Sequence, residues 1–421
     1  MKVHEDRVSR RDFLGTSSLL AASGLIGLGG QTGDAAEAKS TVSTPLLTPS
    51  TDFVDVSRGS PKPHTLKGEA LVKARLTPET WRLEIVADPF VSEQVKSAAS
   101  IGKALTLADG NAIDLPKLLE LGKKYEVRFL KAMQCLNIPA PLGQGLWEGV
   151  PLRDLLRLVG KINNVRRIYY WGYHNDDPKQ IFRSSLSYTQ VMETPPGELP
   201  VFVAYRLNGE PLSLIRGGPV RMVVPWSHGF KSIKWLQQIS LTNDWKSNDT
   251  YAEANNDPES HLKTAAYLDS VDSPIKTGQP VFIRGKVISG LSGLKRVEYW
   301  LRPAPENGSD LGEDDPAWEK AEWIDCPLDA APSDWSRVLP KGVSSKEVLG
   351  FDKKTGQPTV WPLRYSMVTF SATLKGLTPG KYEIRARSVD LNDFAQPEPR
   401  PSQKSGRNPV QVKRFEVVKE G

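Results

Sequence analysis

The chain has 421 residues, with 55 Lys and Arg against 49 Asp and Glu, so its net charge is +6. The basic residues are spread along the sequence, which argues against a nucleic-acid-binding protein. This length predicts about two or three domains with a large buried core. The two cysteines, Cys135 and Cys326, form no C-x-x-C, haem-attachment or zinc-finger spacing. A disulfide between them stays open, because sequence alone cannot test its geometry.

The first 38 residues have the features of an export signal. Residues 9–14 read SRRDFL, residues 13–30 are mostly small and apolar, and AEA at 36–38 offers a cleavage site. We therefore expect a twin-arginine signal peptide over 1–38 and a periplasmic mature protein, exported folded. An ordinary secretory signal or an uncleaved anchor is the alternative. The apolar run is short for a membrane span of about 20 residues, and we expect no span in the mature chain.

The next elements alternate between extended and helical segments. Residues 39–74, rich in Pro, Ser, Thr and Gly, are predicted to form an extended arm with little regular structure. Asp114 is the predicted N-cap of a helix over 114–121, with Pro116 in its first turn and Gly122 at its end. Strands are predicted over 80–86 and 125–130, the second running towards Cys135.

This alternation continues to about residue 260. Helices are predicted over 150–156, ending near Gly160, and over 187–192. Asn208-Gly209 is a strong hairpin turn. Residues 75–260 are therefore predicted to form a mixed α+β domain. Its further strands are predicted over 165–171, 201–206 and 220–225.

Helical patterns almost disappear after residue 260. Short alternating segments are separated by turns such as Thr378-Pro379-Gly380. Residues 261–421 are therefore predicted to form an immunoglobulin-like β-sandwich of about seven strands. The insertion from 303 to 361 is predicted to be loop. The strands are predicted over 280–287, 295–301, 368–374, 381–389 and 410–418.

Four motifs follow one another in the α+β part. They read GLWEGVPLRDLL at 145–156, FVAYRLNGEPL at 202–212, GPVRMVVP at 218–225 and GFKSIKWL at 229–236. In this order, behind a cysteine loop, they resemble the sulfite oxidase family of molybdenum enzymes over roughly residues 75–245. The predicted sandwich resembles that family's dimerisation domain, which implies a homodimer. An outward-facing binding module or spacer is the alternative.

The resemblance implies molybdenum held by one pterin dithiolene and one protein thiolate, and Cys135 stands at the thiolate position. A soft thiolate suits this metal, and coordination removes the thiol proton. A buried free cysteine is the alternative. For the pterin and its phosphate the family also implies cationic and backbone contacts, against which a surface hairpin and a plain turn are the alternatives. The residues at these positions are His174 or Asn175, Arg216, Arg221, Ser232, Ile233 and Lys234.

Two departures from the family pattern bear on the substrate. Sulfite oxidases follow the cysteine with arginines that hold the anion, whereas residues 136–140 here read LNIPA. Because a dianion needs paired positive groups in a dry pocket, we ask whether Arg216, Lys231 or His228 replaces them. The family's RNH-type pterin motif is also missing, and His64 is the candidate for that contact.

A tyrosine follows the pterin lysine in sulfite-oxidising members of the family. Tyr251 lies in a comparable place, and its phenol is a candidate catalytic group that would hydrogen-bond a metal oxo or hydroxo ligand. An ordinary packing tyrosine is the alternative. The aromatic and histidine content of PWSH at 225–228 is typical of a lined pocket or of a packed core.

These features predict an exported molybdenum oxidoreductase that transfers an oxygen atom to or from a small sulfur compound. A sulfite dehydrogenase is favoured, and electrons would pass to a separate carrier, a c-type cytochrome, because the chain has no haem signature. The rival enzyme is a reductase of S-oxides such as methionine sulfoxide, since the uncharged loop suits a neutral substrate. A non-enzymatic scaffold that kept the fold is the third alternative.

Overall fold

The computed structural model describes residues 45–250, 257–306, 308–312, 315–397 and 408–420. The predicted signal peptide over 1–38 and Tyr251 lie outside these residues. Within the described ranges, no helix is both long enough and apolar enough to span a membrane.

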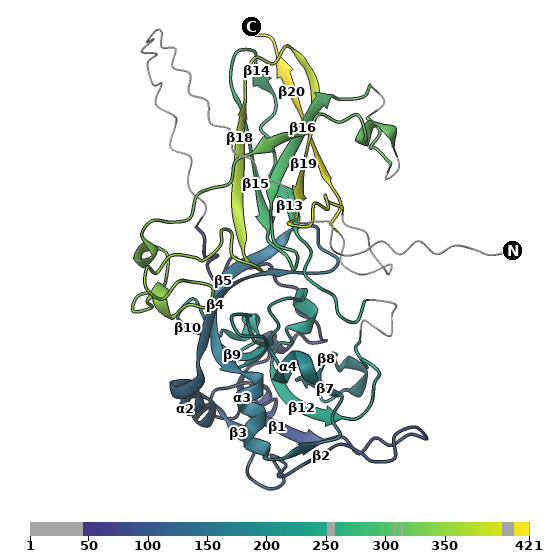
Figure 1. Cartoon of the computed structure of the whole chain (residues 1–421), viewed down its shortest axis with the longest axis vertical. Helices are drawn as coiled ribbons and strands as arrows, with labels where there is room; N and C mark the ends of the chain where they lie inside the picture. Colours follow the sequence, from purple (N-terminus) through teal and green to yellow (C-terminus); the bar gives the residue numbers. More distant parts are fainter. Residues whose placement is uncertain (1–44, 251–256, 307, 313–314, 398–407, 421) are drawn as a thin grey trace, which may run out of the picture. The chain divides into compact units, whose positions relative to one another are not determined.

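The α+β part is built on two sheets (Figure 1). The first has the order β3-β1-β12-β7-β8, in which β1 pairs with β12 in parallel and the other neighbours are antiparallel. The second has the order β10-β9-β5-β4, with β11 also paired to β9. The strands of the first sheet are β1 (Arg82–Ala87), β3 (Ile113–Asp114), β7 (Arg167–Gly172), β8 (Arg183–Ser187) and β12 (Leu236–Thr242). Those of the second are β4 (Val127–Gln134), β5 (Pro141–Pro151), β9 (Phe202–Leu207), β10 (Glu210–Pro211) and β11 (Arg221–Val223).

Short helices connect these strands, and two of them begin at residues whose side chains cap the helix. The Asp114 carboxylate accepts a hydrogen bond from the Lys117 amide at 2.9 Å, and Ser187 forms a capping box with Gln190. The helices are α1 (Gly68–Lys73), α2 (Leu115–Tyr125), α3 (Leu152–Leu156) and α4 (Tyr188–Met192). Apolar side chains from β1, β7, β9 and α3 share one core, which holds the two sheets and the helices together.

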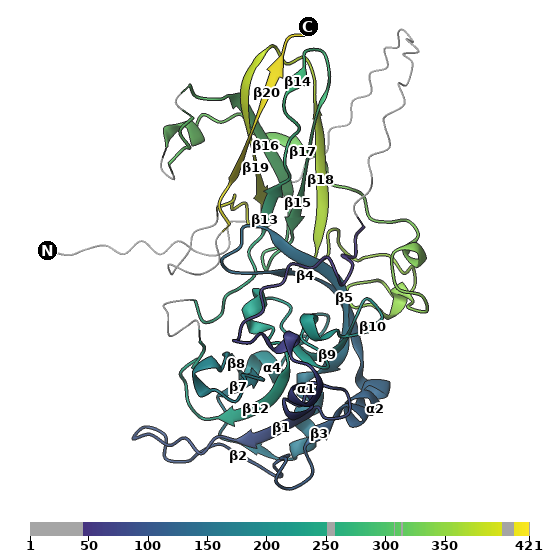
Figure 2. The same cartoon turned by 180° about the vertical axis from the view of Figure 1, so that it is seen from behind.

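Two local predictions were wrong. Residues 68–73 of the predicted arm form α1, drawn in dark purple in Figure 2, because Leu66 and Leu71 find apolar partners beside Trp235. Gly122 does not end α2, which continues to Tyr125. A Cβ at position 122 would meet the Tyr205 hydroxyl, so this glycine serves close packing inside the helix.

The C-terminal part contains two sheets that share one core. Phe370 of the three-stranded sheet and Ile384 of the five-stranded sheet lie in the same buried cluster, which is the arrangement of a sandwich. The five predicted strands are present. The first sheet contains β13 (Ala265–Leu268), β15 (Val281–Ile288) and β18 (Met367–Leu374). The second contains β14 (Ile275–Lys276), β16 (Arg296–Pro303), β17 (Ile324–Cys326), β19 (Gly380–Val389) and β20 (Gln411–Val418).

The insertion over 303–361 is not entirely loop. It contains β17 and three single-turn 3₁₀ helices, η7 (Pro316–Trp318), η8 (Trp335–Arg337) and η9 (Ser345–Glu347). Trp335 and Phe351 pack in one cluster with Leu130 of β4 and Leu146 of β5. These apolar residues are isolated in the sequence and belong to no periodic apolar pattern, so the sequence does not predict that they are buried.

The two cysteines are both free thiols. Cys326 is buried in the sandwich core, where burial raises the pKa of its thiol to about 12. Cys135 packs against a different cluster, at the end of β4. The disulfide that the sequence left open is therefore absent.

The packing at Gly122 predicts an unusual response to alanine. Glycine to alanine inside a helix ordinarily stabilises by about 0.5–1 kcal/mol. Here the added methyl meets the Tyr205 hydroxyl, so we expect Gly122→Ala to lower the free energy of unfolding by about 1–3 kcal/mol. Urea titrations of Gly122→Ala, Tyr205→Phe and the double variant measure this. The double variant should recover part of the loss, and a stabilised Gly122→Ala would contradict the packing.

Candidate active site

One cavity, with about 1100 Å³ of empty space including its open mouth, gathers the residues implied by the resemblance. It lies where the N-terminal arm crosses the end of β4 and the segments after β7, before β11 and before β12. Tyr251 lies outside the described residues. The predicted site residues that line the cavity are Cys135, His174, Asn175, Arg216, Arg221, Ser232, Ile233 and Lys234.

Cys135 follows β4 directly, so the strand delivers its thiol to the cavity. The side chain is half-buried. Next to it, the Gln134 amide donates to the carbonyl of Cys135 at 3.1 Å and to that of Ile138 at 2.5 Å, which folds the following loop back. A Cβ on Gly229 would lie 3.3 Å from the Gln134 carbonyl oxygen, so this glycine lets the 229–234 segment approach the cysteine strand.

Arg221 is buried and is occupied by protein groups. Its guanidinium donates to the carbonyls of Arg216 at 2.9 Å and Ser232 at 2.5 Å, and it lies 5.1 Å from the centre of the Trp147 ring. Burial and the charge of Arg216 lower its pKa to about 9. Arg221 therefore shapes the wall of the cavity and adds positive potential to it.

Lys234 reaches the cavity wall through glycine packing. Gly217, with φ of 97°, has no room for a side chain, because a Cβ would lie 2.7 Å from Cγ of Lys234. The Lys234 ammonium donates to the Asp55 carboxylate at 3.1 Å, the Ser57 hydroxyl at 2.6 Å and the Ile215 carbonyl at 2.7 Å. Burial and Arg221 lower its pKa to about 7, while Asp55 acts in the opposite direction.

Asp55 is the anion of this wall. Burial alone would raise its pKa, but hydrogen bonds from Ser57 and the charge of Lys234 hold the pKa of the carboxyl well below its usual range. The His64 ring also approaches it, with Nε2 3.8 Å from the carboxylate. Asp55 therefore stays ionised and offsets part of the positive charge around the cavity.

Arg216 is the cation with donor capacity left. Its side chain is 4% exposed, its guanidinium lies 5.7 Å from the centre of the Phe53 ring, and its Nε has no hydrogen-bond partner in the described structure. A buried N–H without a partner costs free energy unless a ligand accepts from it. Because Arg216 lines the cavity, an anionic or strongly accepting ligand would satisfy this group.

The segment after β7 forms a turn that brings His174 and Asn175 to the cavity. Asn175 has φ of 57°, and its amide donates to the Pro61 carbonyl at 2.8 Å and to Gln180 Oε1 at 3.1 Å. The turn is thereby tied to the N-terminal arm. Because the Asn175 amide is used in this way, we assign the ligand contact at this position to the His174 side chain, which also lines the cavity.

Two of the suggested replacements for the missing arginines were wrong. In the part of the chain that the structure describes, neither Lys231 nor His228 lines the cavity. Lys231 turns away from the cavity between two lining residues, Phe230 and Ser232, and His228 is buried with Nδ1 3.2 Å from the Ser260 carbonyl. Arg216 is the one of the three that lines it.

The N-terminal arm is the part of the site that sequence reasoning missed. Seven of its residues line the cavity, although the sequence indicated only His64, which stacks on Trp235 at 6.4 Å instead. The sole signal was the alternation of FVDVS at 53–57, in which polar Asp55 and Ser57 face Lys234. The seven residues are Phe53, Val54, Val56, Ser57, Arg58, Gly59 and Pro63.

The strand that leads to Cys135, β4, also carries a buried lysine. Lys131 of β4 is fully buried, and its ammonium donates to three carbonyls, those of Ala132, Pro225 and Ser227, at 3.3, 2.8 and 3.2 Å. Burial, with a smaller effect of Arg221, lowers its pKa to about 7. Lys131 thus links β4 to the segment that leads into residues 229–234.

The comparisons with known proteins agree with this site. A model of the oxidoreductase molybdopterin-binding domain matches residues 120–250. A nitrate reductase [NADPH] of Fusarium oxysporum is 34% identical over 110 residues, which are 26% of this chain and 12% of that protein. The mitochondrial sulfite oxidase of Drosophila melanogaster is 29% identical over 134 residues, 30% of this chain and 23% of that protein.

A longer match and a solved structure extend the likeness. The mitochondrial sulfite oxidase of Rattus norvegicus is 25% identical over 206 residues, 47% of this chain and 35% of that protein. The chain thus spans about a third or less of these curated relatives. The crystal structure of the sulfane dehydrogenase SoxCD from Paracoccus pantotrophus shares the fold, with a TM-score of 0.54 over 90% of this chain and 92% of that chain, at 17% identity.

The residues of the cavity fit Mo-molybdopterin. The free thiol of Cys135 can become a thiolate ligand of the kind that molybdenum binds. The buried Nε–H of Arg216 has no hydrogen-bond partner among the described residues, and a ligand oxygen would accept from it. The cavity walls are positively charged, as a phosphate-bearing pterin needs, and aromatic rings line the space. Lys234 fits less simply, because Asp55 and Ser57 already accept from its ammonium.

The buried Lys131 predicts a specific pH dependence of stability. Between its folded pKa of about 7 and its ordinary value of 10.5, the unfolded chain binds more protons than the folded chain. Raising the pH through this window should therefore stabilise the fold, by up to about 1 kcal/mol per pH unit from this group. Melting temperatures of the wild type and Lys131→Met between pH 7 and 10 test this.

The wild type should gain more stability with pH than Lys131→Met does. Lys123→Met, at an exposed position of α2, is the control and should keep the wild-type slope. Equal slopes in all three proteins would contradict a buried lysine that loses its proton in this window.

Proposed function

Because the chain belongs to the sulfite oxidase family of molybdopterin-dependent oxidoreductases, we propose that it transfers an oxygen atom to or from a small sulfur compound at the cavity of Cys135. The favoured reaction is that of a sulfite dehydrogenase, in which sulfite becomes sulfate and two electrons leave to a separate carrier. The observation that carries this proposal is the meeting of a free thiol with a buried, incompletely bonded arginine in one cavity.

The protein residues would hold and orient the reacting groups. When bound, Mo-molybdopterin supplies oxygen-atom transfer coupled to two-electron cycling of the metal. The Cys135 thiolate would hold the metal at the end of β4. The 232–234 backbone and the positive charge of Arg221 and Lys234 would receive the pterin phosphate. The apolar wall from Phe53, Leu142 and neighbouring rings would exclude water and strengthen these interactions.

Arg216 is the group we assign to anion recognition. The loop over 136–140 carries no charge, and Arg221 and Lys234 already donate to protein acceptors. Arg216 is buried and keeps an unpartnered Nε, so it can grip an oxyanion or the oxygen of a polarised S–O bond. Sulfite is favoured by the similarity to the relatives named sulfite oxidases.

Reduction of a neutral S-oxide is the second candidate function. The observation that favours it is the uncharged 136–140 loop beside Cys135, because a neutral substrate requires no paired cations there. A c-type cytochrome, periplasmic export by the twin-arginine signal over 1–38 and a homodimer through the sandwich complete the proposal. Sedimentation at micromolar concentration that finds monomer alone would remove the dimer.

Metal content and two assays test the proposed function together. Protein from its own export pathway should contain about one molybdenum per chain, reduce cytochrome c with sulfite, and lose both in Cys135→Ser, because the thiolate is the protein's bond to the metal. Metal mass spectrometry and steady-state kinetics measure this. Oxidation of a reduced dye by methionine sulfoxide, without sulfite activity, would move the function to S-oxide reduction.

A protein that contains no molybdenum in a host that loads related enzymes would contradict both enzymatic functions. The chain would then be a scaffold that kept the fold. A Cys135→Ser variant with wild-type metal and activity would contradict the assignment of the thiolate.

Arg216 predicts a difference between charged and neutral substrates. Removing its guanidinium in Arg216→Gln should raise the KM for sulfite about tenfold or more, because a charge-assisted hydrogen bond in a buried site is lost. The KM for a neutral sulfoxide should change less. Arg216→Lys, which keeps the charge, is the matched control and should show a smaller effect on sulfite. Equal KM changes for both substrates would contradict anion recognition by Arg216.

A further inference from the structure

Lys231 lies between two residues that line the cavity, Phe230 and Ser232, but its own side chain points away from the cavity. It ends the 3₁₀ turn η5 (Gly229–Lys231), whose Gly229 and Phe230 line the cavity, and Ser232 after it lines the cavity as well. The Lys231 side chain is 1% exposed. A lysine in this position costs free energy to bury, so its surroundings have to hold it in place.

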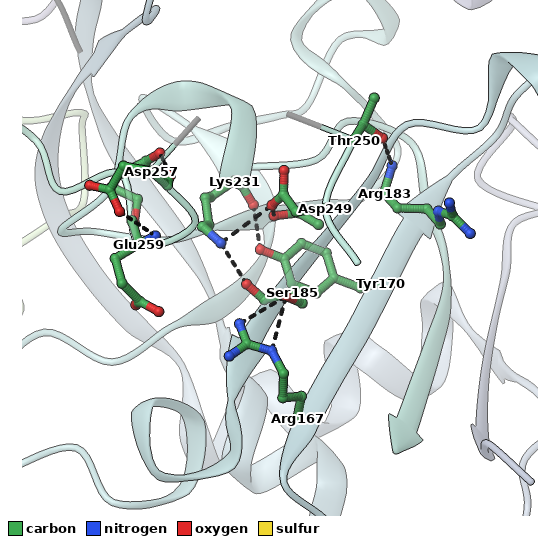
Figure 3. A network of polar contacts seen from close by, with 12 residues as sticks. Arg167, Tyr170, Arg183, Ser185, Lys231, Asp249, Thr250, Asp257 and Glu259 are labelled. Atoms are coloured by element: carbon green, nitrogen blue, oxygen red, sulfur yellow. Dashed lines mark hydrogen bonds and ion pairs between the residues drawn. The ribbon is translucent and has the colours of Figure 1, made fainter. Parts of the chain in front are cut away.

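A buried polar network receives the Lys231 ammonium (Figure 3). The ammonium donates to the Ser185 carbonyl at 2.7 Å and to the Asp249 carboxylate at 3.4 Å. Asp249 has no exposed side-chain surface and also accepts from the Ser184 hydroxyl at 2.7 Å. The lysine is thereby joined to β8 and to the chain that follows β12.

The main chain of the same residue is held from a second strand. The Tyr170 hydroxyl, on β7, donates to the Lys231 carbonyl at 2.8 Å, and Tyr170 is fully buried. Arg167, also on β7, donates to the Ser185 hydroxyl at 2.9 Å and so braces the acceptor strand. Figure 3 shows the contacts of Tyr170 and Ser185 meeting at Lys231. Its backbone and side chain are therefore fixed independently by the first sheet.

The position of Lys231 is transmitted to the cavity through Ser232. The Ser232 carbonyl accepts from the Arg221 guanidinium, and its hydroxyl accepts from the Val224 amide at 3.1 Å. A shift of the turn at Lys231 would move Ser232 and with it the acceptor that orients Arg221. Lys231, in the buried network, is thus joined by one peptide bond to Ser232, which lines the cavity.

We propose that Lys231, paired with Asp249, is a positioning residue that fixes the 229–234 segment against the first sheet so that the segment meets the cofactor's phosphate in one geometry. This inference rests on the proposed function. A buried ion pair adds little net stability compared with apolar residues, so its contribution here is geometric rather than energetic. The network is separate from the cavity lining, so it touches neither substrate nor cofactor.

Three variants separate positioning from stability. Lys231→Met and Asp249→Asn each remove one charge of the ion pair and leave the opposite charge buried, so both should melt at lower temperature than the wild type. The double variant Lys231→Met/Asp249→Asn removes both charges and should recover most of the melting temperature. If the pair positions the segment, molybdenum and pterin per folded chain should nevertheless stay about tenfold below the wild type in the double variant.

The readouts are metal mass spectrometry, pterin fluorescence after release, and the electron paramagnetic resonance spectrum of the molybdenum that remains. A matched control is Arg385→Met/Glu383→Gln, which removes a buried pair 2.6 Å apart within β19 of the sandwich. The control should change the melting temperature without changing cofactor per folded chain or the spectrum.

The outcomes distinguish the two levels of the account. A double variant with full cofactor and a wild-type spectrum would overturn the positioning role of Lys231. A cofactor deficit that disappears in step with the recovered melting temperature would also overturn it, because the pair would then be structural alone. A wild-type protein without molybdenum would instead contradict the proposed function.

Discussion

Lys131, Arg216, Arg221 and Lys234, in or near the cavity, are wholly or largely buried, and protein groups have to replace the hydration that burial removes. In place of water, Lys131 and Arg221 donate hydrogen bonds to backbone carbonyls. Lys234 donates to Asp55, Ser57 and a backbone carbonyl. The lowered pKa values of Lys131 and Lys234, each about 7, reflect the remaining cost. Of these four cations, Arg216 keeps an Nε without a hydrogen-bond partner among the described residues, and an anionic ligand would satisfy it. The buried cations thus give the site both its positive charge and, through the unpartnered Nε of Arg216, a place for an anionic ligand.

The topology explains how distant residues meet at this point. Cys135 leaves β4 and Arg221 opens β11, and both strands belong to the second sheet. The chain then crosses from β11 to β12 of the first sheet, and the crossing carries residues 229–234. The amide of Met222 donates to the carbonyl of Ile233 at 2.9 Å, which closes the crossing onto β11. The cavity therefore lies at the passage between sheets, a place where ligand sites commonly form because loops converge there.

Sequence reasoning succeeded where a local rule decides the structure. Asp114 and Ser187 cap helices through their own side chains, and the strands of the sandwich follow alternation. It failed where a distant partner decides. Position 122 has no room for a side chain because the Tyr205 hydroxyl packs against it inside the helix, so its glycine is not a helix end. Lys231 turns away because Asp249 and Ser185 accept its ammonium. The arm lines the cavity because its Asp55 and Ser57 meet Lys234, a pairing across more than a hundred residues that no spacing rule contains.

The central claim is that the Cys135 thiolate holds molybdenum together with a single pterin dithiolene. X-ray absorption at the molybdenum edge of the purified protein tests it most directly, by counting sulfur neighbours of the metal. The account predicts two sulfurs from the dithiolene and one from the protein, with the protein sulfur absent from whatever metal remains in Cys135→Ser. A metal with only dithiolene sulfurs in the wild type, or an unchanged count in Cys135→Ser, would contradict it.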